Sequence, residues 1–143
     1  MPRVRARSKL GAHEASMLLR TLMVFFAGGA GSAARYLAGL RIQQAMGGAF
    51  PLGTVTINIT GSFLIAMIMG ISLRTTWLTA DTRLLLTTGF CGGYTTYSTF
   101  NYETLALAQQ GAWGLAAAYV SSTLVGCLVA GVLGLFLARL VAG

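Results

Sequence analysis

Charged residues are scarce in this sequence, and acidic residues are the scarcest of them. Only 9% of the 143 residues are charged, and three are acidic, while 55% are hydrophobic. A soluble domain usually carries about 25% charged residues. At about 20 residues per membrane-spanning helix, the chain has room for roughly four spans and no separate soluble domain. The composition therefore predicts a small all-α integral membrane protein.

Cysteine and histidine are also rare. Cys91 and Cys127 lie in apolar segments without CxxC spacing, and His13 stands alone near the N-terminus. An isolated cysteine commonly behaves as a small hydrophobic residue, so we expect two buried free thiols. The sequence contains no nucleophile–base pair and no phosphate-binding loop. These absences argue against an enzyme.

The net charge of +7 raises the possibility of nucleic-acid binding. Four of the cations, Arg3, Arg5, Arg7 and Lys9, cluster in the first residues, and the others flank or interrupt apolar segments. This distribution is typical of topology signals and lipid-headgroup anchors. We therefore expect membrane lipid, and no nucleic acid, as a partner.

The hydrophobic pattern divides the chain into a tail and four spans. Residues 1–16 show no apolar periodicity and are predicted to be a disordered basic tail. The rest, 17–143, is predicted to form one transmembrane domain, with spans at about 17–40, 53–73, 84–108 and 113–141. The first span resembles a signal peptide, but apolar residues continue past Arg35, which favours a retained helix. Short loops make neighbouring spans antiparallel.

The cations also bear on orientation. With four spans, the tail, Arg20, Arg74, Arg83 and Arg139 fall on one side, and Arg41 falls on the other. The positive-inside rule then places both termini in the cytoplasm. This bias depends on the tail, and a start of translation at Met17 instead of Met1 would largely remove it.

The third span contains the most informative segment, residues 89–100 (GFCGGYTTYSTF). Irregular backbone at membrane depth survives only where protein buries it or where it lines a watery cavity. Gly92 and Gly93 permit such a departure from helix. The freed carbonyls would suit a hard cation such as Na⁺. The sequence therefore predicts a broken third helix that carries an ion site.

Three polar residues within the spans are candidates for function. Arg35 is either functional or an arginine that extends to the headgroups. Asn58 either grips an anion through its NH₂ group or clamps two helices together. Glu103 is the one acid in the predicted spans, and it keeps a proton-coupled mechanism open.

Two aromatic residues follow the glycines of the third span. Tyr97 and Phe100 are three residues apart, so they share a helix face. Aromatic rings have positive edges, and two edges beside a path can stabilise a passing anion. Core packing is the alternative, and the spacing alone does not decide between the two.

Three ordered motifs resemble the small fluoride channels of the Fluc or CrcB family. They are residues 28–36 (GGAGSAARY), residues 51–63 (PLGTVTINITGSF) and residues 89–100, the last of which is similar to the family signature GFCGG-x-TTFSTF. The resemblance covers nearly the whole chain from about Met23 onward. It implies an antiparallel, dual-topology homodimer of four-helix subunits, with two fluoride pathways and a structural Na⁺ at its centre.

The resemblance also implies roles for single residues. The backbone carbonyls of Gly92 and Thr95 would hold the Na⁺, and Arg35 would support the pore vestibule. The fluoride pathway would be lined by residues from three spans: Asn58, Tyr97, Phe100, Tyr119 and Thr123. The hydroxyls of Ser98 and Thr99, which can contact an ion, complete the predicted pathway. Tyr97 stands where the family has a phenylalanine, and its hydroxyl is a departure from the pattern.

The sequence therefore predicts a passive fluoride-selective channel in the plasma (inner) membrane of a bacterium, which lets fluoride leave the cytoplasm. The alternative is a proton-coupled small multidrug exporter that uses Glu103. A further alternative is a membrane scaffold that transports nothing and would tolerate the loss of Asn58.

Overall fold

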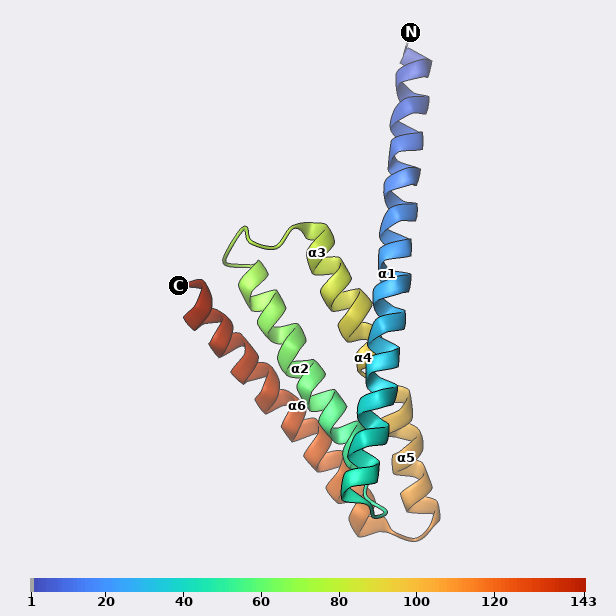
Figure 1. Ribbon diagram of the computed structural model, residues 1–143, viewed down its shortest axis with the longest axis vertical. Helices are drawn as coiled ribbons and strands as arrows, with labels where there is room; N and C mark the ends of the chain where they lie inside the picture. Colours follow the sequence, from blue (N-terminus) through green and yellow to red (C-terminus); the bar gives the residue numbers. More distant parts are fainter. Residues whose placement is uncertain (1) are drawn as a thin grey trace.

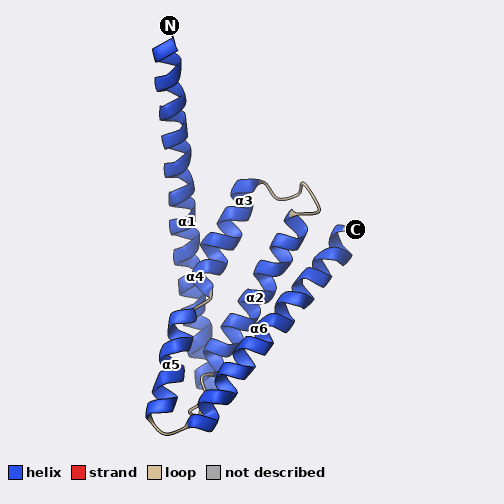
Figure 2. Cartoon of the chain, turned by 180° about the vertical axis from the view of Figure 1, so that it is seen from behind, coloured by secondary structure: helices blue, strands red, loops and turns tan. Residues whose placement is uncertain are grey.

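The computed structural model describes the backbone of residues 2–143 and the side chains from Glu14 onward. Within these residues the chain is helical and contains no strand (Figures 1 and 2). The elements in chain order are α1 (Pro2–Met46), α2 (Leu52–Ser72), α3 (Ala80–Leu84), the π-helix η1 (Leu85–Cys91), α4 (Gly92–Tyr94), α5 (Tyr97–Gln109) and α6 (Trp113–Ala142).

Three of the helices are long and apolar enough to cross a membrane. They comprise Glu14–Met46 of α1, all of α2 and all of α6. The third predicted span is a series of shorter pieces, α3 to α5, with an interruption after Tyr94. The prediction of an all-helical membrane protein with a broken third helix is confirmed.

The first helix is longer than predicted. Residues 1–16 were expected to be disordered, but α1 runs without a break from Pro2 through the first span. Two physical reasons account for this difference. Proline is tolerated at the first position of a helix, and the segment that follows is rich in alanine and arginine, which favour helix. Met1 lies outside the described residues.

The connections lie at two opposite ends of the molecule. The start of α1, the loop between α2 and α3, and the end of α6 lie toward one end, which we call the terminal end (Figure 1). The α1–α2 and α5–α6 connections lie at the other end. Helix α2 packs along α6, while α1 packs along η1 and α4. Spans that follow one another in the chain therefore run antiparallel with short connections, whereas the two packed pairs, α2 with α6 and α1 with the third span, run parallel (Figure 1).

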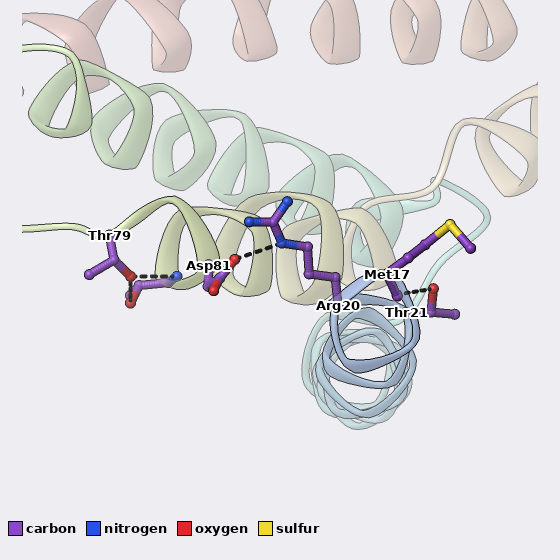
Figure 3. Close-up of polar contacts among 6 residues, drawn as sticks. Met17, Arg20, Thr21, Thr79 and Asp81 are labelled. Carbon is purple, nitrogen blue, oxygen red and sulfur yellow. Dashed lines mark hydrogen bonds and ion pairs between the residues drawn. The ribbon is translucent and has the colours of Figure 1, made fainter. Parts of the chain in front are cut away.

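An ion pair joins α1 to the start of the third span. The Nε of Arg20 donates to Oδ1 of Asp81 at 2.9 Å (Figure 3). Thr79 caps the N-terminus of α3, because its hydroxyl accepts a hydrogen bond from the backbone N–H of Thr82. Both side chains of the ion pair are about half exposed. An exposed pair contributes about 0–1 kcal/mol, so it orients α3 more than it stabilises the fold.

Small residues set the distance between α1 and the third span. A Cβ added at Gly31 would collide with the backbone carbonyl of Phe90, and a Cβ at Gly93 would collide with that of Gly28. Close packing of backbones holds helices together where the hydrophobic effect cannot. Gly31 and Gly93 thus mark a close approach of α1 to the third span.

The other contact that depends on small residues is between α2 and α6. A Cβ at Gly134 would lie 2.5 Å from the backbone oxygen of Phe63, and one at Gly126 would lie 2.5 Å from Cδ1 of Ile59. A Cβ added at Gly131 of the same helix would have nothing within 4 Å.

Candidate functional site

The break in the third span is at Thr95 and Thr96, between α4 and α5. Both residues have extended backbone, with φ/ψ of −80°/159° at Thr95 and −152°/112° at Thr96. We had placed the break at Gly92 and Gly93, and this was wrong, because both residues lie within α4 and Gly92 has helical angles of −62°/−37°. At Gly93 the missing side chain serves the close approach to α1 instead of an unusual backbone conformation.

Asn58 of α2 replaces the helical partners that Thr96 has lost. The backbone N–H of Thr96 donates to Oδ1 of Asn58 at 2.8 Å, and Nδ2 of Asn58 donates to the carbonyl of Thr96 at 3.0 Å. Asn58 and Thr96 are both buried. Of the two expectations for Asn58, the interhelical clamp is therefore observed. An amide NH₂ carries two hydrogens, so one N–H remains for a further acceptor.

Hydroxyl groups complete the start of α5. The backbone N–H of Thr99 donates to Oγ1 of Thr96 at 3.2 Å, and the two threonine hydroxyls are 2.9 Å apart. Thr96 is thus a standard N-cap for α5. The N-terminus of a helix carries partial positive charge, and here it lies in the middle of the third span. This arrangement can attract an anion at membrane depth.

A groove of about 330 Å³, the narrow groove, lies on one side of the break. Its walls come from α2, the third span and α6. They include most of the residues predicted for the pathway and the ion site: Asn58, Gly92, Thr95, Tyr97, Phe100 and Thr123. Apart from backbone and hydroxyl groups, the walls are mainly apolar.

A second groove of about 780 Å³, the wide groove, is lined by α1, α2 and α5. Among its walls are Arg35, Thr54, Thr99 and Glu103. Thr96 lines both grooves. The clamped break therefore separates a wide groove that contains both signs of charge from a narrow one that contains neither.

Arg35 brings an unpaired cation to the wide groove. Its Nε is buried and has no hydrogen-bond partner among the side chains and backbone that the structure describes. A buried polar group without a partner is costly, and a charged one more so. Arg35 lines the wide groove, so its guanidinium charge can attract an anion that enters this groove. This favours the functional interpretation of Arg35 over the anchor.

Glu103 is held by two hydroxyl donors. Its Oε2 accepts a hydrogen bond from the Tyr119 hydroxyl at 2.6 Å, and its Oε1 accepts one from Thr54 at 3.2 Å. These contacts orient the carboxylate at the wall of the wide groove. Thr54 was not predicted, although it is four residues before Asn58 and so shares its face of α2.

Tyr119 lies behind the grooves and lines neither of them. It is fully buried, and its ring packs against Phe100 at 5.1 Å and Phe50 at 5.7 Å between centroids. The fluoride pathway predicted from the resemblance included Tyr119, but its ring is part of the core. It contacts the walls of the wide groove through its hydrogen bond to Glu103 and its packing on Phe50.

The remaining pathway candidates divide by their exposure. Tyr97 is 76% exposed and Phe100 only 6%, and both line the narrow groove with ring centroids 5.7 Å apart. Thr123 contributes a buried hydroxyl that has no partner in the described part of the chain. Ser98 is exposed and lines neither groove, and its hydroxyl is 3.5 Å from that of Thr96.

Near the end of α4, the backbone carbonyls of Gly92 and Thr95 are free of hydrogen bonds from the described residues, whereas those of Cys91 and Gly93 are engaged. The Cys91 carbonyl accepts hydrogen bonds from the N–H and hydroxyl of Thr95, and the Gly93 carbonyl accepts one from Ser32. No hydrogen bond among the described residues reaches the carbonyls of Gly92 or Thr95. The residues named for Na⁺ thus have oxygen atoms to offer. Side-chain clusters that could bind a metal do not occur from Glu14 onward.

The two cysteines are free, as predicted. Cys91 is buried beside the break, whereas Cys127 is only half-buried. Both line the narrow groove.

Comparison with known proteins gives consistent matches over most of the chain. The family described as "CrcB-like protein, Camphor Resistance (CrcB)" matches residues 22–135, which include every residue of the two grooves. A protein of Anaeromyxobacter sp. (strain K) named "Fluoride-specific ion channel FluC" is 49% identical over 126 residues, covering 88% of this chain and 100% of that protein. Proteins of the same name are 46% identical in Chlorobaculum tepidum and 45% identical in Sorangium cellulosum, each over 87% of this chain and 98% of the relative.

Proposed function

Because this chain belongs to the CrcB family, we infer that it is a fluoride-specific ion channel. The observation that carries this inference is the clamped break at Thr96, which both grooves share. Lipid offers no partners to broken backbone, so a break at this depth needs the internal partner that Asn58 supplies. The channel lets fluoride pass down its gradient and catalyses no reaction.

In this proposal fluoride enters from the wide groove. The unpaired Nε of Arg35 raises the local concentration of anions there. The N-terminus of α5, capped by Thr96, then attracts the ion with its partial positive charge. Thr99 lines the wide groove at this point and offers a hydroxyl.

Past Thr96, polar groups and ring edges of the narrow groove take the place of the water molecules around the ion. The second N–H of Asn58, the unpartnered hydroxyl of Thr123 and the edges of the Phe100 and Tyr97 rings are the available positive groups. Removing the water shell from a bulkier halide leaves an ion that fits a narrow path less well. Selectivity for fluoride would arise on this side of the break.

The proposal includes a second copy of the chain, inserted with the opposite orientation. A single four-helix subunit encloses little space, and its helices expose large apolar side chains that a partner or lipid must cover. The Gly92 and Thr95 carbonyls of both copies would hold a Na⁺ between them. Such an ion would neutralise carbonyl dipoles and lock the two third spans together.

We place the channel in the plasma membrane of a bacterium, where it would release fluoride from the cytoplasm. Three apolar helices and a broken third span support a multi-pass membrane protein. The bacterial relatives support the kind of cell.

The test is efflux from liposomes that contain the purified full chain, measured with a fluoride electrode and compared with chloride. We expect rapid fluoride release and negligible chloride release. Equal release of both ions would overturn the selectivity, and no fluoride release from folded, reconstituted protein would overturn the channel.

The exporter alternative makes a different prediction for Glu103. A proton-coupled exporter would lose transport in Glu103→Gln, because its carboxylate must bind and release the proton. The channel should keep fluoride flux within about threefold, since the glutamine oxygen can still accept a hydrogen bond from Tyr119 while its NH₂ group donates to the Thr54 hydroxyl. Flux that depends on a pH gradient and disappears in Glu103→Gln would favour the exporter.

A further inference from the structure

A third recess lies at the terminal end, away from the two grooves. It has a volume of about 310 Å³ and is formed between the ends of α2 and α6. Its walls are Gly70, Leu73, Arg74, Leu135 and Arg139. None of these residues lines the narrow or the wide groove, so the fluoride pathway does not explain them.

Close packing of α2 on α6 shapes this recess. A Cβ at Gly70 would lie 2.6 Å from Cβ of Ala138 and 3.4 Å from Cδ2 of Leu135. The two helices therefore meet at Gly70, next to the recess. Leu73 and Leu135 add apolar walls, and Leu73 is 75% exposed.

Two arginines, one from each helix end, line the same recess. Arg74 follows α2, where its backbone N–H bonds to the carbonyl of Ile71, and Arg139 lies in the last turn of α6. Neither makes an ion pair or side-chain hydrogen bond with any residue from Glu14 onward. Asp81 pairs with Arg20, and the Ser72 hydroxyl accepts a hydrogen bond from Arg83.

Each arginine alone would be explained as a cation that complements the negative end of its own helix. That explanation does not account for two guanidinium-bearing side chains that share a recess with apolar walls. Arginine has a planar, fork-like set of donors that matches the oxygens of a phosphate. Basic pockets between helices at a membrane surface are where lipid headgroups bind.

We propose that this recess binds an anionic phospholipid. Arg74 and Arg139 bind the headgroup phosphate, and the first part of an acyl chain lies along Leu73 and Leu135. The apolar walls and the position at the ends of two spans favour a lipid over a soluble phosphate. The inference concerns a separate site, and it holds whether or not the chain conducts fluoride.

The experiment is native mass spectrometry of the purified full chain, titrated with phosphatidylglycerol and with phosphatidylcholine of the same acyl chains. We expect wild type to bind phosphatidylglycerol more tightly. The double variant Arg74→Gln/Arg139→Gln should lose about 30-fold in this preference, about fivefold for each cation near a lipid surface. Arg41→Gln removes one cation at the opposite end and should leave the preference unchanged.

Two results would overturn the proposal. One is a double variant that keeps the wild-type preference, and the other is equal binding when soluble glycerol 3-phosphate replaces the lipid. Fluoride efflux from phosphatidylcholine liposomes, measured on the same proteins, should be equal in wild type and double variant. A chain that shows the lipid preference but no fluoride flux would leave this site standing and remove the proposed function.

Discussion

The two grooves beside the break differ in size and in chemistry, although they share Thr96. The wide groove, about 780 Å³, holds a cation with an unpaired nitrogen and an oriented carboxylate. The narrow groove, about 330 Å³, holds no charged side chain and is bounded by Phe100 and Tyr97. The charges of the wide groove thus attract an ion, and the shape and weak donors of the narrow groove select among ions.

This division has a physical basis in the range of each interaction. A charge acts over about 10 Å at 0.1 M salt, so it can recruit an ion without contacting it closely. Ring edges and hydroxyl groups act only in contact, and they distinguish ions by size and hydration. Substitutions on the two sides should therefore change different properties.

The largest effect should come from removing the Asn58 clamp on the break between the two grooves. In Asn58→Ala, the N–H and C=O of Thr96 lose their partners in a buried place, at about 1–3 kcal/mol for each group. The broken conformation then becomes rare, and fluoride efflux should fall about 100-fold. Thr56→Ala, an exposed position on the same helix, should conduct normally. Unchanged efflux in Asn58→Ala would show that the clamp is not required.

The next effect should come from the narrow groove. Phe100→Leu removes the positive ring edge beside the path, so fluoride efflux should fall about tenfold while chloride stays excluded. Phe136→Leu is the matched control, because that ring is 57% exposed and lines neither groove. If Phe100→Leu lowers the melting temperature but leaves efflux unchanged, Phe100 serves the core alone.

A smaller effect, with a different signature, should come from the wide groove. Arg35→Gln should lower fluoride efflux about fivefold at low ionic strength, and less at 1 M salt, where the attraction of the cation is screened. The comparison is with Arg41→Gln, whose arginine lines neither groove. A salt-independent loss would assign Arg35 a structural role.

The smallest effect on efflux should come from removing a tyrosine hydroxyl. Tyr97→Phe keeps the ring edge and removes only an exposed hydroxyl, so efflux should change by less than about twofold. Tyr102→Phe makes the same change in the wide groove, at a residue that is 73% exposed. A large change in selectivity in Tyr97→Phe alone would show that this departure from the family pattern sets the channel's properties.

Much of the fold could be predicted from the sequence. Apolar runs and short loops are local features, and they gave the spans 53–73 and 113–141 to within one residue of α2 and α6. The broken third helix could be predicted because glycines and hydroxyls are unfavourable inside an ordinary span. The helical residues 2–16 could not, because a basic composition fits both a disordered tail and a helix that continues from a span.

The site was harder to predict, because it depends on contacts between distant residues. The position of the break follows from the pairing of Asn58 with Thr96, and no local spacing encodes that pairing. Gly93 was expected to loosen the backbone, but its contact with Gly28 is visible only once α1 is in place. Tyr119 shows the same limit, since helical periodicity could not separate the groove from the core behind it.

The clamp also bears on how the chain is made. Asn58 precedes Thr96 by 38 residues, so a ribosome completes α2 before it adds the residues of the break. The partner that satisfies the broken backbone is therefore already available when the third span leaves the translocation machinery. A permuted gene that encoded the third span ahead of α2 would present that backbone to lipid without its partner.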